Sequence, residues 1–303
     1  MRHHGVRGLI VTTALCAVTL GTAGLGSATP SAALCGAPPE ASAVPAGRGG
    51  PAREPDLGQV HTDMPAAAKG QAAAGFHARI PVYVHVITAG AVGNLTDQQI
   101  ADQIRVLNVT YAGGEGGADT GFSFRLAGVT RTDNAAWFNA GPGGVDEKRM
   151  KEALRQGGPD ALNFYSTTAG DFLGWAYLPN IVDKGPKANL DGIVIDWESL
   201  PGVSTTYAGR YDQGETATHE VGHWLNLEHT FLGGCRHGGD FVDDTPAEKT
   251  PTSGCPAGKD TCKAPGLDPI HNYMDYSYDS CYTEFTPGQV QRMRDAWLLY
   301  RAP

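Results

Sequence analysis

Two histidines and a glutamate stand at a spacing that suits hydrolysis by a metal-activated water. His219 and His223 are four residues apart, so on a helix their side chains project from one face about one turn apart. Both imidazoles can therefore bind one zinc ion. Glu220, beside the first histidine, can act as a base toward a metal-bound water.

A third histidine, His229, lies six residues past His223, too far along to share a straight helix face. It can bind the same ion only if the chain turns sharply near Asn226 and comes back. Three histidines at this spacing favour a metal centre over solvated or core side chains. The remaining candidates, His77, His85, His237 and His271, are not expected to be ligands, although His271 is a candidate for lining a cleft.

Composition and length are those of a globular protein. The 303 residues are 41% hydrophobic and 18% charged, enough for one large domain or two small ones. The net charge is -9 and no basic stripe is present, so no nucleic-acid partner is expected.

The N-terminus predicts a secretory signal peptide over residues 1–33. Arg2 and Arg7 make the N-terminal region positively charged, and the stretch from Leu9 to Leu20 is apolar. Small residues precede position 34, as at a cleavage site. A membrane anchor is the alternative, but the apolar stretch is shorter than the ~20 residues that a spanning helix needs. We therefore expect a secreted, extracellular protein with no stable membrane association.

Residues 34–78 are rich in Ala, Gly and Pro, cannot form a core alone, and are expected to be a pro-segment. A catalytic domain is expected over 79–303, with an upper subdomain at 79–228 and a lower one at 229–303. Strands are predicted over 80–87, 122–129, 161–165 and 192–197, and helices from Thr96, over 146–155, 214–228 and 287–300. The predicted fold class is α+β, with a mixed twisted sheet, an active-site helix and a loop-rich C-terminal part.

Four of the six cysteines fall in one Gly- and Pro-rich region: Cys235, Cys255, Cys262 and Cys281. In an exported protein this clustering predicts two disulfides, and four cysteines allow three pairings. A zinc knuckle is the alternative, but the paired CxxC spacing of such sites is missing.

Further motifs follow the segment 219–229, which contains the three histidines, and they come in a fixed order along the chain. They are Thr230-Phe231, Asp243-Asp244-Thr245-Pro246, Gly254-Cys255-Pro256, Asn272-Tyr273-Met274-Asp275-Tyr276 and Phe285-Thr286-Pro287-Gly288-Gln289. Over roughly residues 79–303 the chain resembles metzincin zinc metalloproteases of the pappalysin (ulilysin-like, M43) family. One departure is Asn226, where the family has glycine at a turn of positive φ. Asparagine is the best-tolerated substitute there.

The resemblance implies a metzincin-like catalytic domain and a role for each site residue. His219, His223 and His229 supply three nitrogens to zinc, and Glu220 moves a proton from water to the leaving amine. Met274 forms an apolar floor beneath the ion, and Tyr276 stabilises the oxyanion. A core methionine and a buried structural tyrosine are the alternatives for the last two.

Asp279, five residues after Met274, matches an aspartate of the S1′ pocket in ulilysin-like members. A carboxylate there pairs with Arg through two hydrogen bonds, so cleavage before Arg, less often Lys, is expected. A solvated loop aspartate is the alternative.

The resemblance also implies calcium in an oxygen-rich loop, on Asp240, Asp243 and Thr245, with Asp244 and Glu248 nearby. A solvated acidic turn is the alternative. It further implies the disulfides Cys235–Cys262 and Cys255–Cys281.

Cys35 with Gly36 resembles the pro-segment cysteine that caps zinc in latent members, where a thiolate displaces the catalytic water. An unpaired or lipid-modified cysteine is the alternative, although Leu34 does not suit a lipid-attachment motif. If Arg is preferred at P1′, self-cleavage between Ala78 and Arg79 would release the mature enzyme.

The expected protein is a secreted zinc endopeptidase, made as a latent precursor and acting as a monomer on proteins or peptides. A catalytically silent zinc-containing binding protein and a zinc hydrolase of non-peptide substrates are the alternatives. An intact Glu220 beside an open coordination position argues against the first, and the extended cleft implied by the resemblance disfavours the second.

Overall fold

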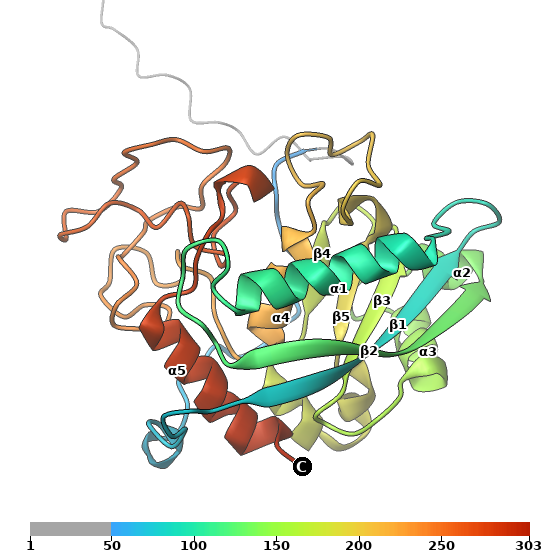
Figure 1. Ribbon diagram of the computed structural model, residues 1–303, viewed down its shortest axis with the longest axis horizontal. Coiled ribbons are helices and arrows are strands. Elements are labelled where there is room, and N and C mark those ends of the chain that lie inside the picture. Colours follow the sequence, from blue (N-terminus) through green and yellow to red (C-terminus); the bar gives the residue numbers. More distant parts are fainter. Residues whose placement is uncertain (1–49) are drawn as a thin grey trace, which may run out of the picture. The chain divides into compact units, whose positions relative to one another are not determined.

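A twisted sheet occupies the centre of the computed structural model, which describes residues 50–303 (Figure 1). The expected signal peptide, the first part of the pro-segment and Cys35 lie outside the described residues. The five strands of the described chain are β1 (Ala78–Thr88), β2 (Phe122–Asp133), β3 (Leu162–Thr167), β4 (Gly174–Ala176) and β5 (Ile193–Asp196). Their order is β2-β1-β3-β5-β4, with β4 antiparallel at one edge and the other pairs parallel.

Helices cover both faces of the sheet. Helices α1 (Asp97–Tyr111) and α4 (Glu215–Trp224) pack on one face, while α2 (Ala135–Phe138) and α3 (Val145–Leu154) lie on the other (Figure 1). The two-residue period of β1 explains this layering. Val84 and Val86 join the core under α1 and α4, whereas Ile87 joins the core under α2 and α3.

The buried His85 of β1 has an ordinary structural role. Its Nδ1 lies 2.8 Å from Thr130 Oγ1 and its Nε2 lies 3.0 Å from Asn163 Oδ1. Both ring nitrogens therefore have partners inside the sheet, as the sequence led us to expect.

Two helices begin at matching capping boxes. In α1, Thr96 Oγ1 accepts a hydrogen bond from Gln99 N, and the Gln99 side chain accepts one from Thr96 N. Helix α5 (Pro287–Ala296) begins in the same way at Thr286 and Gln289, and continues into a π-helical turn over Trp297–Arg301. The predicted helix starts are confirmed at both places.

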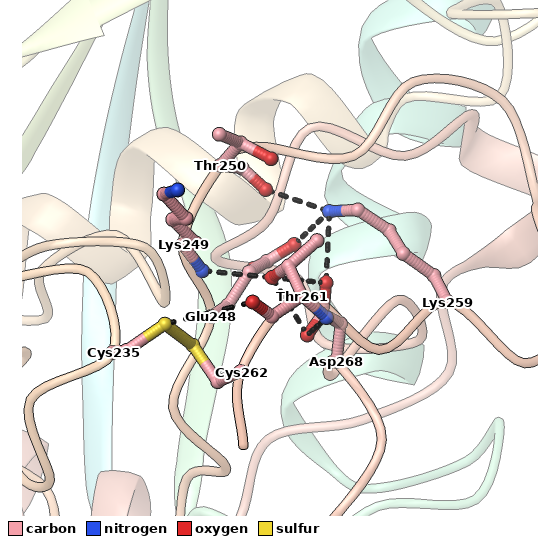
Figure 2. Close-up of a disulfide and its surroundings, with 8 residues drawn as sticks. All are labelled: Cys235, Glu248, Lys249, Thr250, Lys259, Thr261, Cys262 and Asp268. Carbon is pink, nitrogen blue, oxygen red and sulfur yellow. Dashed lines mark hydrogen bonds and ion pairs between the residues drawn. A yellow bond between two sulfur atoms is a disulfide. The ribbon is translucent and has the colours of Figure 1, made fainter. Parts of the chain in front are cut away.

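The chain after α4 is rich in loops and contains two disulfides, Cys235–Cys262 and Cys255–Cys281. This is the pairing that the family resemblance implies. Beside the first disulfide, Lys259 contacts the buried carboxylates of Glu248 and Asp268 (Figure 2). A cation between two buried acids ties three loop positions together without regular secondary structure.

The expected α+β class is confirmed, with differences in detail. Strand β4 and helix α2 were not predicted, because three and four residues are too few for a periodic signal. Helix α4 ends at Trp224, whereas the sequence predicted an end near Glu228. Within residues 50–303, none of the helices has the length and apolarity needed to cross a bilayer.

Candidate active site

Three imidazoles converge on one point. Nε2 of His223 lies 3.1 Å from Nε2 of His219 and 3.1 Å from Nε2 of His229. Nδ1 of His219 lies 2.5 Å from Tyr273 O, and Nδ1 of His223 lies 2.8 Å from Leu227 O. A proton on each of these Nδ1 atoms leaves the lone pair on Nε2, so the converging nitrogens can bind a cation.

A left-handed residue brings the third histidine back to the helix. Helix α4 ends at Trp224, and Asn226 has a φ of 77°. The expected sharp turn is therefore confirmed at the expected residue. Two arginines of the C-terminal segment hold it: Arg292 Nε donates to Asn226 O at 2.7 Å, and Arg301 Nε donates to Trp224 O at 2.9 Å. Neither arginine was predicted from the sequence to contact this turn.

Glu220 faces the edge of the sheet. Its side chain is buried, and Oε2 has no hydrogen-bond partner among the described residues. A Cβ added to Gly174 of β4 would lie 2.7 Å from the backbone oxygen of Val194 and 2.8 Å from Glu220 Oε1, so glycine is needed at that point of the strand. Burial, and secondly the nearby Glu54 carboxylate, raise the pKa of Glu220 well above its usual range.

Met274 and Tyr276 lie where the resemblance places them, next to the histidines. Met274 is fully buried, and a Cβ added to Gly222 of α4 would lie 2.4 Å from its Sδ. The Tyr276 ring lies 5.8 Å from the His219 ring and 5.0 Å from the His229 ring. A phenol beside three imidazoles and a buried carboxylate can stabilise negative charge on a bound substrate oxygen.

Comparisons with known proteins agree with this geometry. The peptidase family described as pregnancy-associated plasma protein-A (M43) matches residues 203–297. An extracellular metalloprotease of Arthroderma benhamiae is 47% identical over 228 residues, 74% of this chain and 73% of that protein. One of Pyricularia oryzae is 47% identical over 244 residues, 78% of this chain and 81% of that protein. The chain belongs to the M43 peptidase family.

Solved structures show the same architecture. Mature mirolysin of Tannerella forsythia in complex with a cleaved peptide has a TM-score of 0.61 and 32% identity, covering 73% of this chain and 92% of mirolysin. A promirolysin variant of that organism has a TM-score of 0.63 and 32% identity, covering 74% of this chain and 81% of promirolysin. The protein is thus a metalloendopeptidase with a metzincin fold, a class that carries a metal and acts on proteins.

A pocket of this metalloendopeptidase lies beside the histidines and is lined by four acids, Glu54, Glu215, Glu220 and Asp279. Glu215 and Asp279 both line it, and both are buried. Asp279 Oδ2 accepts a hydrogen bond from Gln213 N at 2.8 Å, whereas Oδ1 of Asp279 and Oε2 of Glu215 have no hydrogen-bond partner in the described chain. Burial raises the pKa of Asp279 to about 7. Burial, and next the Asp279 carboxyl, raise that of Glu215 to about 9.

Glu215 was not predicted as a pocket residue, although its position in the sequence carries a signal. Glu215, His219 and His223 follow one another at four-residue intervals and therefore share a face of α4. An acid four residues before His219 is thereby placed in the same pocket as Asp279.

In the acidic loop after His229, some side-chain oxygens have hydrogen-bond or ion-pair partners and others have none among the described residues. Asp244 Oδ1 accepts a hydrogen bond from Thr286 Oγ1 at 2.6 Å and Oδ2 one from Gly288 N at 2.8 Å, while Glu248 contacts Lys259. By contrast, Asp240 Oδ2 and Thr245 Oγ1 are buried without a hydrogen-bond partner in residues 50–303. Only these two, with the exposed Asp243, retain oxygen atoms for a hard cation.

The N-terminal segment of the described chain reaches the histidines as well. Glu54 Oε1 lies 2.6 Å from Nε2 of His219, 3.3 Å from that of His223 and 3.1 Å from that of His229. This contact was not predictable from the sequence, because no pattern distinguishes Glu54 from the other polar residues that precede β1.

Proposed function

We propose that this protein is a secreted zinc endopeptidase made as a latent precursor. The observation that carries the proposal is the convergence of three Nε2 atoms beside the buried Glu220. Three imidazoles with one open position are the usual donor set of a catalytic zinc site. The names of the extracellular relatives support export, which the signal peptide proposed over residues 1–33 would direct.

His219, His223 and His229 would hold the ion. When bound, zinc polarises the scissile carbonyl and lowers the pKa of water. Glu220 takes a proton from the attacking water and delivers it to the leaving amine. Tyr276 donates a hydrogen bond to the substrate oxygen as negative charge develops there. Met274 supports the site from below.

We further propose that the pocket receives Arg, less often Lys, at P1′. Asp279 and Glu215 both have an unpaired buried oxygen in this pocket, and a guanidinium can donate to two oxygens at once. Calcium on Asp240, Asp243 and Thr245 remains a proposal, supported by the unpaired oxygens of the first and last of these residues.

Processing would remove a pro-segment over residues 34–78 and leave the proposed catalytic domain at 79–303, divided near 228. The peptide bond proposed for cleavage links Ala78 to Arg79, the first two residues of β1. These two residues pair with Phe122 and Ser123 of β2. Hydrolysis therefore requires this strand end to leave the sheet. N-terminal sequencing of the secreted form tests the position, and a start far from Arg79 would contradict it.

Metal content and casein hydrolysis, measured on one purified sample, test the central proposal. We expect about one zinc per chain, and hydrolysis that is lost with a chelator and restored by zinc. A metal-free active protein, or hydrolysis that persists after His219, His223 and His229 are replaced by alanine, would overturn it.

A further inference from the structure

Glu54 completes a ring of four acceptor atoms. Its carboxylate oxygen lies within 3.3 Å of all three imidazole Nε2 atoms, and its side chain is only 16% exposed. Nδ1 of His219 and of His223 each donate to a backbone carbonyl, so their Nε2 atoms carry lone pairs. These lone pairs point toward those of the Glu54 carboxylate. Such a ring is unfavourable unless a positive charge lies inside it. A divalent cation supplies that charge, and carboxylate oxygens are common zinc ligands.

The residues on either side of Glu54 fix its approach. Ala52 N donates to the hydroxyl of Tyr211 at 3.1 Å, and Arg53 forms an ion pair with Asp171 at 3.4 Å. Ala52, Arg53 and Glu54 line the same pocket as Glu215 and Asp279. The segment therefore lies at the pocket into which the proposed P1′ side chain must enter.

Gln59 and His61, which follow Glu54 in the chain, attach this N-terminal segment to the edge of the sheet and to Glu228, one residue before His229. Leu178 N donates to the Gln59 side chain at 2.6 Å, and Gln59 Nε2 donates to Ala176 O of β4 at 3.3 Å. Farther on, His61 Nδ1 lies 2.8 Å from Glu228 Oε2. Contacts on both sides of Glu54 lower the entropy cost of holding its carboxylate over the histidines.

We propose that Glu54 is the fourth ligand of the divalent cation in the uncleaved chain. Residues 52–61 would then block the pocket while Glu54 excludes the attacking water. The inference rests on the proposed function, because it requires that the three histidines hold a metal. It assigns to Glu54 the capping role that the family resemblance suggests for Cys35.

Visible and near-ultraviolet absorption of the cobalt-substituted precursor distinguishes the two ligands. The full chain is prepared in a Glu220→Ala background, so that it cannot process itself, and Glu54→Gln, Glu54→Ala, Cys35→Ser and Asp56→Asn are compared. Asp56 is a matched control, since its carboxylate accepts a hydrogen bond from Gly58 N and has no contact with the histidines among the described residues. A thiolate ligand gives an intense sulfur-to-cobalt charge-transfer band, and a carboxylate does not.

We expect the spectrum to shift with both Glu54 substitutions and to stay unchanged with Cys35→Ser and Asp56→Asn. We also expect a chelator to remove the metal faster from the two Glu54 variants than from their parent. A charge-transfer band that disappears in Cys35→Ser, together with an unchanged Glu54→Gln spectrum, would overturn the inference while leaving the zinc site intact. A parent chain that binds no cobalt or zinc would instead overturn the proposed function.

Discussion

Gly222 and Met274 approach so closely that a single added methyl group could not fit between them. A Cβ on Gly222 would lie 2.4 Å from Sδ and 3.2 Å from Cε of Met274. Gly222 lies on α4 between His219 and His223, and Met274 lies on the loop that accepts the Nδ1 proton of His219 through Tyr273 O. Close packing therefore links the helix to the loop beneath the site.

Gly222→Ala is expected to destabilise the protein and weaken metal binding. In an ordinary helix this change stabilises by roughly 0.5–1 kcal/mol, whereas overpacking a core costs about 1–3 kcal/mol. The free energy of unfolding should therefore fall, and zinc should dissociate faster. Denaturant unfolding and a chelator competition measure the two effects. Gly141→Ala is the control, because its Cβ would meet no atom within 4 Å; equal behaviour of both variants would contradict the packing explanation.

The arrangement of the three histidines in residues 219–229 was predictable, because it depends on spacing within a short stretch of the sequence. Spacing on one helix places His219 and His223, and the required turn locates Asn226, whose φ of 77° agrees. Contacts between distant segments have no such pattern. Glu54 meets residues more than 160 positions away, and Arg301 reaches Trp224 only because the C-terminal segment packs against α4. The length of β4 is likewise set by its partner β5 rather than by its own three residues.

Glu220→Gln is expected to keep the fold and the metal while abolishing hydrolysis. The amide preserves the shape of the side chain but cannot accept the proton of the attacking water. We expect kcat/KM to fall by about 10²-fold or more, with unchanged metal content and thermal unfolding midpoint. A peptide assay and metal analysis on the same sample check this. Retained turnover in the purified variant would remove Glu220 from the mechanism.

Asn226 offers a test of backbone strain at the turn. Its φ is positive, and its side-chain Nδ2 is buried without a hydrogen-bond partner in the described chain. The backbone holds the turn, since Asn226 N donates to His223 O at 2.8 Å and Asn226 O accepts from Arg292 Nε. Asn226→Gly should therefore leave the free energy of unfolding unchanged or raise it. Asn226→Ala should lower it by about 1 kcal/mol, because a left-handed residue with a Cβ is strained. Chemical denaturation of the metal-loaded protein measures both, and the opposite order of the two variants would count against strain at this position.

The acid pair in the pocket predicts that preference for Arg at P1′ depends on pH. Burial raises the pKa of Asp279 to about 7, with Asp212 adding to the shift. Burial and Asp279 together raise that of Glu215 to about 9. Below pH 7 both carboxyls are neutral, and between pH 7 and pH 9 the pair carries one negative charge. The ratio of kcat/KM for Arg over Leu peptides should therefore rise about tenfold per pH unit up to pH 7 and then level off.

The raised pKa values of Asp279 and Glu215 also predict how the free energy of unfolding changes with pH. A carboxyl whose pKa is raised in the folded state contributes stability below its unfolded pKa, and this stability is lost as pH rises through the folded value. Asp279→Asn should remove the pH dependence of the Arg-to-Leu ratio and lessen the loss of folding stability that occurs as pH rises from 3.8 to about 7. Glu215→Gln, which keeps a hydrogen-bond donor beside Asp279, should retain the dependence. Paired peptides that differ only at P1′, assayed from pH 5 to pH 9, measure the ratio. A ratio near one at every pH in the parent protein would show that neither acid selects the P1′ side chain.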